Sequence, residues 1–293
     1  MAAGVFIGGS HGKSALVTIG PSLRQAHAFV FDVDGTLALS ENPNSGTGIQ
    51  PLQKAADVLQ RVRTSGRRLV CFTNGSGQVP AAQAGRLRAV GLPIEDCELL
   101  TPANIAAMYL CREYPGAPVL AFGNEGLLAP LRGASVSLAT LEDAKRVAAV
   151  LIGADPEFTY PKLVAACRAV WAGAPLLVTS MAPWFASRGG RMPSTSGAIA
   201  AGIMHATGAE PVVVGKPSPL VLPILASLLD CRPDQLAVVG DDVHLEIRMG
   251  REAGACTLLV LSGSTSEAEL AHVPEHLRPY LVVPDISALL ERV

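Results

Sequence analysis

Charged residues are scarce in this chain of 293 residues, and neither sign of charge dominates. Lys and Arg together number 23 and Asp and Glu 25, which leaves a net charge of −2. High charge with few apolar residues is typical of intrinsically disordered chains, so this composition argues against that class. It also implies no broad basic surface of the kind that nucleic-acid binding requires. We therefore expect a folded protein with no nucleic-acid partner.

Membrane-spanning runs, a secretion signal and closely spaced cysteine pairs are also missing. No apolar stretch reaches the length of about 20 residues that a membrane-spanning helix needs. The N-terminus lacks the charged start and long apolar block of a secretion signal. The six cysteines form no Cys-x-x-Cys pair, and several stand inside apolar runs, as buried thiols do. These absences predict a cytoplasmic protein with no membrane partner.

Apolar residues make up 49% of the chain, enough for a sizeable core. Short apolar runs alternate with longer amphipathic segments, which predicts βαβ units and a mostly parallel sheet. Runs such as 29–31 are apolar at successive positions, as expected of strands buried on both faces. The predicted strands are 28–33, 68–73, 119–122, 147–152, 176–179, 211–214, 236–239, 257–261 and 281–283. The predicted helices are 53–64, 80–90, 101–111, 160–172, 196–207, 219–229 and 246–253.

Polar residues end four of these predicted strands. Ligands bind at the carboxyl ends of strands in open α/β sheets, so the four segments should converge on one crevice. In the first segment, Asp32 and Asp34 project to the same side and repel each other unless a cation lies near. Their hard oxygen atoms suit Mg²⁺, and Gly35 lets the chain turn sharply after them. The alternative is that two Asp and a Gly mark only a surface turn.

The second and third segments carry groups that can bind a phosphate. The Thr73 hydroxyl, the Asn74 amide and the backbone around Gly75 can all donate hydrogen bonds to phosphate oxygens. Lys216 stands just after a predicted strand and is followed by prolines, so its ammonium can neutralise a phosphate and a carboxylate together. The alternative for Lys216 is an ordinary solvated loop lysine.

The fourth segment is a second acidic cluster. Asp241 could complete an oxygen-rich metal site. Asp242 could act as an accessory carboxylate or instead cap the following helix. Glu246 is a further accessory candidate, while His244 is expected to be a surface or packing residue and not a metal ligand.

The order of these segments, read as DVDGT, TNG, GKPSP and GDDVHLE, resembles the four motifs of the haloacid dehalogenase superfamily. Residues 153–163 and 193–199 resemble segments of its subfamily IIA, which includes p-nitrophenyl, pyridoxal and phosphoglycolate phosphatases. The resemblance spans residues 27–290. It implies a Rossmann-like parallel-sheet core, residues 26–114 and 207–293, with a large inserted α/β cap, residues 115–206. Residues 1–25, rich in Gly and Ser, are expected to form a flexible extension. Homodimerisation through the cap is common in the subfamily.

The resemblance also implies a Mg²⁺-dependent phosphatase acting on small-molecule phosphate monoesters. Asp32 would be the nucleophile that forms an aspartyl-phosphate, and Asp34 would protonate the leaving alcohol and then activate water. Lys216 would hold the nucleophile and the phosphate. The phosphoryl group would be bound by Thr73, Asn74, Gly75 and Lys216. The Mg²⁺ ligands would be Asp32, the backbone carbonyl of Asp34, and Asp241.

Two departures from the subfamily pattern affect the metal and the substrate. Leu245-Glu246 stands where the subfamily has Thr-Asp, so Asp241 is a better metal ligand than Glu246. Residues 179–183 stand where the subfamily has TNPD, so its amide and acid are replaced by smaller or apolar groups, and Trp184 follows. Met181, Pro183 and Trp184 are therefore candidates for substrate specificity. This replacement predicts a more apolar leaving group. The polar segment 40–49 is either a solvated loop or a substrate contact.

Three other functions compete with hydrolysis. A fold can host unrelated functions, so a binding or regulatory protein with weak or no catalysis remains an alternative. A phosphotransferase differs only in the acceptor of the phosphoryl group. An ATPase would need a P-loop, but Gly8–Ser14 offers only an approximate one, because Ile7 stands where the pattern requires Gly.

Overall fold

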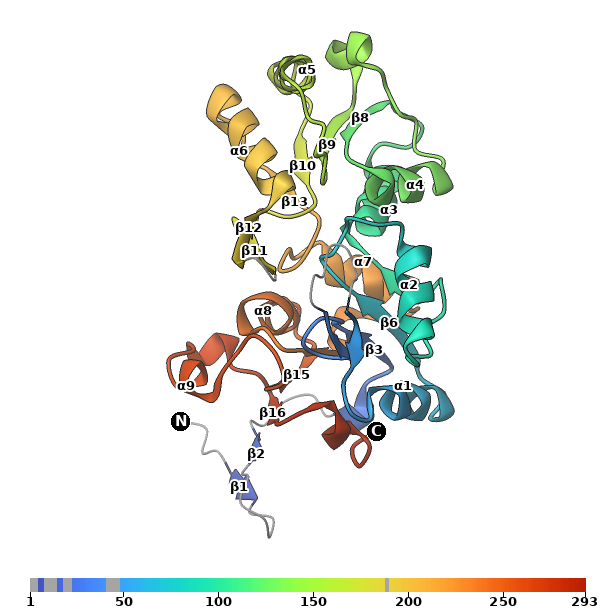
Figure 1. The fold of residues 1–293 in the computed structure, drawn as a ribbon, viewed down its shortest axis with the longest axis vertical. Helices are drawn as coiled ribbons and strands as arrows, with labels where there is room; N and C mark the ends of the chain where they lie inside the picture. The colour runs from blue at the N-terminus through green and yellow to red at the C-terminus, as the bar shows by residue number, and fades with distance from the viewer. Residues whose placement is uncertain (1–4, 8–14, 18–22, 41–47, 188–189) are drawn as a thin grey trace.

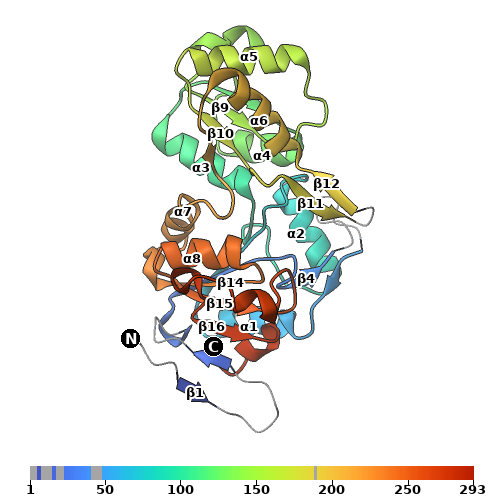
Figure 2. The same ribbon diagram turned by 90° about the vertical axis from the view of Figure 1, so that its left-hand side faces the viewer.

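The computed structural model describes residues 5–7, 15–17, 23–40, 48–187 and 190–293. Its strands form one large and one smaller sheet, each built mainly from parallel strands with helices packed against them. Figures 1 and 2 both place the smaller sheet, with α5 and α6, at one end of the molecule and the large sheet at the other. The predicted α/β fold class is confirmed.

The large sheet has the strand order β1-β2-β16-β15-β14-β3-β6-β7. Six neighbouring strands of this sheet run parallel, in the order β16-β15-β14-β3-β6-β7. Strand β2 pairs with β16 in the antiparallel direction. The strand bounds are β1 Val5–Ile7, β2 Ala15–Val17, β3 Ala28–Phe31, β6 Arg68–Phe72, β7 Leu99–Leu100, β14 Leu236–Gly240, β15 Cys256–Val260 and β16 Leu281–Val283. A small hairpin, β4 Ala38–Leu39 with β5 Gln50–Pro51, follows β3.

Alternating side chains of the central strands enter two different apolar clusters, which is why these strands are apolar throughout. Phe29 and Phe31 pack on the face covered by α1 and α2. Val30 packs on the opposite face, with α3 and α7. The helices of this part are α1 Ala55–Thr64, α2 Pro80–Ala89, α3 Pro102–Glu113, α7 Val221–Leu228, α8 Arg248–Glu252 and α9 Glu267–Leu270. Short 3₁₀ helices are η1 Leu23–Gln25, η3 Pro233–Gln235, η5 Glu275–Leu277 and η6 Ile286–Leu289, and η4, Val243–Ile247, is a π-helix.

The smaller sheet has the order β13-β10-β9-β8, with all strands parallel. One of its faces packs against α5 and α6, and α4 packs with residues of the other face. The bounds are β8 Val119–Phe122, α4 Glu125–Gly133, η2 Leu141–Arg146, β9 Ala149–Ile152, α5 Tyr160–Trp171, β10 Leu176–Val178, α6 Thr195–Thr207 and β13 Val212–Val213. A hairpin of β11, Trp184–Ser187, and β12, Gly190–Pro193, lies at a level between the two sheets in both views.

The predicted cap of residues 115–206 contains most of the smaller sheet. Strand β13 follows residue 206, yet it pairs with β10, so this sheet extends past the predicted boundary. The exact residues at which core and cap meet therefore stay a prediction.

The N-terminal segment contributes strands to the large sheet. Within the predicted flexible extension, residues 5–7 and 15–17 form β1 and β2, and residues 23–25 form a 3₁₀ helix. Pairing with β2 covers the edge of β16, whose backbone groups would otherwise lack partners. The approximate P-loop, 8–14, and most of segment 40–49 lie outside the described residues. No helix in the described part of the chain is both long and apolar enough to span a bilayer.

Candidate active site

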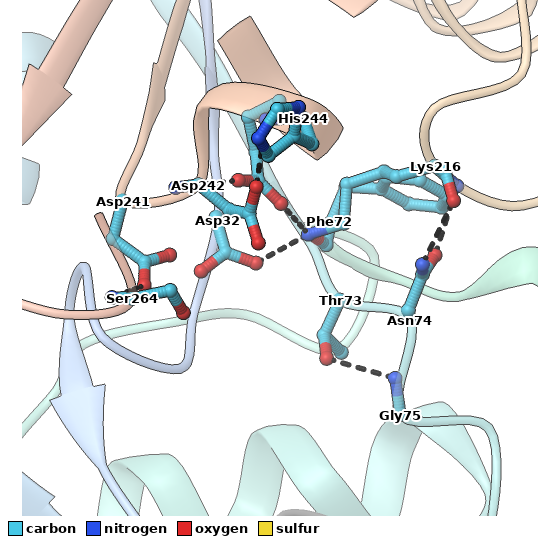
Figure 3. A network of polar contacts seen from close by, with 11 residues as sticks. Asp32, Phe72, Thr73, Asn74, Gly75, Lys216, Asp241, Asp242, His244 and Ser264 are labelled. Carbon is cyan, nitrogen blue, oxygen red and sulfur yellow. Dashed lines mark hydrogen bonds and ion pairs between the residues drawn. The ribbon is translucent and has the colours of Figure 1, made fainter. Parts of the chain in front are cut away.

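Neighbouring parallel strands deliver their polar ends to one edge of the large sheet, as the sequence predicts. Asp32 follows β3, Thr73 follows β6, and Asp241 follows β14. The sheet continues into the site, since the backbone N–H of Asp32 donates to the Val239 carbonyl at 2.9 Å. Figure 3 shows these side chains together with Lys216, which comes from a distant part of the chain.

Lys216 is only 4% exposed, and its ammonium group lies at the centre of the site. Its Nζ donates to Oδ1 of Asp32, lies 2.6 Å from Oε1 of Glu246, and donates to the carbonyl of Phe72 at 3.0 Å. An ammonium has three N–H donors, so each has an acceptor in the protein. The alternative of a solvated loop lysine is therefore wrong.

Asn74 and Gly215 fix the backbone that carries this lysine. The Asn74 side chain accepts from the Lys216 N–H at 2.9 Å and donates to the Lys216 carbonyl at 3.1 Å. A Cβ at Gly215 would overlap the carbonyl oxygen of Thr179 and lie 2.8 Å from Oδ1 of Asn74. The Asn74 side chain thus holds Lys216, while the predicted contact of the Asn74 backbone with the phosphoryl group stays a prediction.

The buried charges of the site do not balance. Burial raises the pKa of Asp32 well above its usual range, opposed by the Lys216 ammonium, and burial likewise raises the pKa of Glu246. Burial lowers the pKa of Lys216, but the carboxylates of Asp32 and Glu246 outweigh this effect and raise it. Besides burial, the pKa values of Asp32 and Glu246 are raised by neighbouring carboxylates, Asp241 among them, because a single ammonium faces several carboxylates. A further cation would relieve this excess of negative charge.

The residues fit a hard divalent cation at this position. Oδ2 of Asp32 is buried and has no hydrogen-bond partner among the described residues. Gly35, at φ +88°, brings the turn after β3 so close to Asp241 that a Cβ there would overlap the Asp241 carboxylate. Carboxylate and carbonyl oxygens are the ligands that Mg²⁺ prefers. In the described part of the chain, no three His, Cys, Asp or Glu side chains gather as a metal site. The predicted set instead combines two carboxylates with the Asp34 carbonyl.

Asp34 lies in the turn that follows β3 and is half-buried. Burial raises the pKa of its carboxyl, and a hydrogen bond from the Ser40 hydroxyl acts against this rise. A raised pKa favours the protonated form that a general acid needs. The pKa values of both aspartates are raised by burial, and the two carboxyls differ in their partners, because Asp32 pairs with Lys216 and Asp34 accepts from Ser40.

The segment after β6 forms a tight loop held from several sides. The Thr73 hydroxyl accepts from the Gly75 N–H at 3.0 Å. Gln83 donates to the carbonyls of Gly75 and Gln78 at 2.9 and 2.8 Å. From the smaller sheet's side, Asn124 donates to the Gly77 carbonyl at 3.0 Å. Phosphate binding by Thr73, Asn74 and Gly75 stays a prediction.

The three acidic residues after β14 make different contacts. Asp241 accepts the backbone N–H of Ser264 at 2.6 Å. Asp242 caps the π-helix by accepting the His244 N–H at 2.7 Å, as its helix-cap alternative predicts, and His244 is exposed. Glu246 is 3% exposed and accepts the Asp242 N–H at 3.2 Å while it pairs with Lys216.

Sequence reasoning missed the serines that support the site. Ser262 donates to the Gly35 carbonyl at 2.7 Å, Ser264 holds Asp241, and Ser40 reaches Asp34. The polar run 262–266 directly follows a predicted strand, so the rule used for the other strand ends could have found it. Ser40 begins the polar segment 40–49, for which the sequence predicts a solvated loop or a substrate contact and not a contact with Asp34.

The predicted specificity residues follow β10. Met181 is half-buried and packs against the apolar cluster shared by β9, β10, α5 and α6. Pro183 is exposed, and Trp184, 43% exposed, begins the β11–β12 hairpin. Their role in substrate choice stays a prediction.

Comparisons with known proteins agree with this geometry. The family model described as haloacid dehalogenase-like hydrolase matches residues 29–137, and a second, HAD-hydrolase-like model matches residues 213–289. Chronophin of Rattus norvegicus is 35% identical over 284 residues, covering 92% of this chain and 88% of the relative. The chain belongs to the haloacid dehalogenase-like hydrolases.

Solved structures of this hydrolase family share the whole fold. The p-nitrophenyl phosphatase from Archaeoglobus fulgidus superposes with a TM-score of 0.80 at 26% identity, covering 93% of this chain and 100% of that one. A glycerol phosphate phosphatase from Mycobacterium tuberculosis, in complex with magnesium, gives a TM-score of 0.79 at 27% identity, covering 92% and 78%. The predicted subfamily IIA, with its Rossmann-like core and inserted cap, is confirmed. The protein is a phosphatase of the haloacid dehalogenase type.

Proposed function

We propose that this haloacid dehalogenase-type phosphatase is Mg²⁺-dependent and hydrolyses small-molecule phosphate monoesters through a phosphorylated Asp32. The observation that carries the proposal is the state of the Asp32 carboxylate. One oxygen is held by Lys216, and the other is buried without a hydrogen-bond partner among the described residues. A carboxylate fixed in this way is oriented for attack while its second oxygen remains available to a cation.

The reaction has two steps on this chain. An oxygen of Asp32 bonds to phosphorus as the bond to the leaving oxygen breaks, and Asp34 gives that leaving oxygen its proton. The Asp34 carboxylate then takes a proton from a water molecule whose oxygen bonds to phosphorus as the bond between phosphorus and Asp32 breaks, which releases phosphate and restores the Asp32 carboxylate. Lys216 keeps the nucleophile in place in both steps and offsets charge on the phosphoryl oxygens.

The metal ligands proposed are Asp32, the Asp34 carbonyl and Asp241. When bound, Mg²⁺ supplies positive charge that offsets both the carboxylates and the phosphoryl oxygens. The excess of negative charge around Lys216 supports this ligand set.

The proposed setting is a reducing cytoplasm, which the six cysteines support because all are free thiols. Assembly into a homodimer and the lack of a nucleic-acid partner stay predictions from the sequence.

Phosphate release from a panel of monoesters, with and without Mg²⁺, tests the proposal. We expect turnover that requires Mg²⁺ and that favours esters with apolar leaving groups. A preference for small charged esters such as phosphoglycolate would contradict the apolar leaving group alone. Transfer to added alcohols in place of water would indicate a phosphotransferase, and a folded protein with no turnover would indicate a binding protein.

A further inference from the structure

Ser40 makes a contact with the reacting part of the site that the roles described so far leave unexplained. Its hydroxyl donates a hydrogen bond to Oδ1 of Asp34, and both residues are half-buried. Among the described residues, the Ser40 hydroxyl is the side-chain group that donates a hydrogen bond to the Asp34 carboxyl. Ser40 thus contacts the residue that exchanges protons with the leaving group and with water.

The backbone brings these two residues together. After β3 the chain turns, and the Val33 carbonyl accepts the N–H groups of Leu37 and Ala38 at 2.9 and 3.0 Å. The Gly35 N–H donates to the Ala38 carbonyl at 2.8 Å. Ser40 stands directly after β4, which is paired with β5. Because these main-chain hydrogen bonds fix the turn, they also fix the approach of Ser40 to Asp34.

This hydrogen bond distinguishes the two oxygens of the Asp34 carboxyl. A protonated carboxyl has one O–H oxygen and one carbonyl oxygen, and the carbonyl oxygen is the better acceptor, so the hydrogen bond from Ser40 favours Oδ1 as the carbonyl oxygen. The proton is therefore directed to Oδ2. Proton transfer depends on a donor that is both within reach and correctly oriented.

We infer that Ser40 is a positioning residue for proton transfer by Asp34, an inference that rests on the function proposed above. The Oδ2 proton of Asp34 passes to the leaving oxygen as the phosphorus–oxygen bond of the ester breaks and the bond to Asp32 forms. The Asp34 carboxylate later takes a proton from the attacking water. Ser40 retains its own proton throughout, and this role requires only its contact with Asp34.

Leaving-group dependence of Ser40→Ala tests this role. An alkyl phosphate has a poor leaving group that must be protonated, whereas p-nitrophenolate leaves with little help. General acid catalysis contributes about 10²–10⁴-fold, and loss of orientation removes part of it. We expect kcat/KM to fall about tenfold for the alkyl ester and less than about twofold for p-nitrophenyl phosphate. Ser40→Thr, which keeps the hydroxyl, should restore most of the lost rate.

Ser287→Ala is the matched control. The Ser287 hydroxyl donates to Oδ1 of Asp285 at 2.5 Å, after β16, which lies three strands from β3 in the sheet. This variant should leave the ratio of the two kcat/KM values unchanged. An equal loss on both esters in Ser40→Ala, or no loss on either, would overturn the role of Ser40. No turnover of either ester by the wild type would instead contradict the proposed function itself.

Discussion

Replacing Lys216 with Met removes the ammonium at the centre of the site while keeping most of the side-chain volume. The carboxylates of Asp32 and Glu246 then lose their shared partner, and their side chains are 6% and 3% exposed. Removing one partner of a buried ion pair costs about 3–5 kcal/mol, because an uncompensated buried charge remains. We expect the free energy of unfolding, measured by chemical denaturation without Mg²⁺, to fall by about this amount at neutral pH.

The pH dependence of this loss identifies its cause. Without the ammonium, the pKa values of Asp32 and Glu246 in the folded protein rise further above their unfolded values. A carboxyl with a raised folded pKa binds more protons folded than unfolded, so its stability is present at low pH and lost as pH rises through the folded pKa. The stability deficit of Lys216→Met should therefore be smaller near pH 5 than near pH 8.

Lys54→Met is the control, because the Lys54–Asp57 ion pair has a similar length of 2.9 Å but side chains that are 52% and 55% exposed. It should unfold at the wild-type denaturant concentration. Wild-type stability in Lys216→Met, or a deficit that grows as pH falls, would refute the reasoning.

Three further predictions concern the metal and the residues that hold Lys216. Mg²⁺ at a hundred times its dissociation constant should stabilise the wild type by about 2.7 kcal/mol, which a rise in the melting temperature should show. An equal rise in Asp241→Asn would argue against Asp241 as a Mg²⁺ ligand. Gly215→Ala places a Cβ against the Thr179 carbonyl oxygen, so denaturation should show a loss of about 1–3 kcal/mol. Asn74→Ala removes both hydrogen bonds to the Lys216 backbone and should lower kcat about tenfold, with an unchanged kcat contradicting its positioning role.

The main residues of the site could be predicted because strand ends are visible in the sequence. Asp32, Thr73 and Asp241 each follow an apolar run, and parallel strands bring such ends to one edge of a sheet. The pairing of Glu246 with Lys216 could not be predicted in this way. It depends on a π-helix that turns the Glu246 side chain onto Gly240 and the ammonium, which local propensity does not encode.

In the fold, too, short apolar runs could be predicted as strands, whereas a helix and a hairpin that contain proline and glycine could not be predicted. Strands β8 and β16 have their predicted bounds, since both are short apolar runs. Helix α4 was not predicted, because it contains Pro130 and begins and ends near glycines, which local rules assign to loops. The β11–β12 hairpin is defined by cross-strand pairs such as Trp184 with Pro193, and a Pro in a short run argues against a strand.

The phosphorylated state of Asp32 is the most direct test of the proposed mechanism. The protein with Mg²⁺ would be mixed with a radiolabelled phosphate monoester, quenched in acid within one turnover, and digested so that each labelled peptide is identified. We expect label on the peptide containing Asp32, released by hydroxylamine as acyl phosphates are, and absent from Asp32→Asn. Turnover without any labelled protein under the same quench, or label on another residue, would contradict Asp32 as the nucleophile.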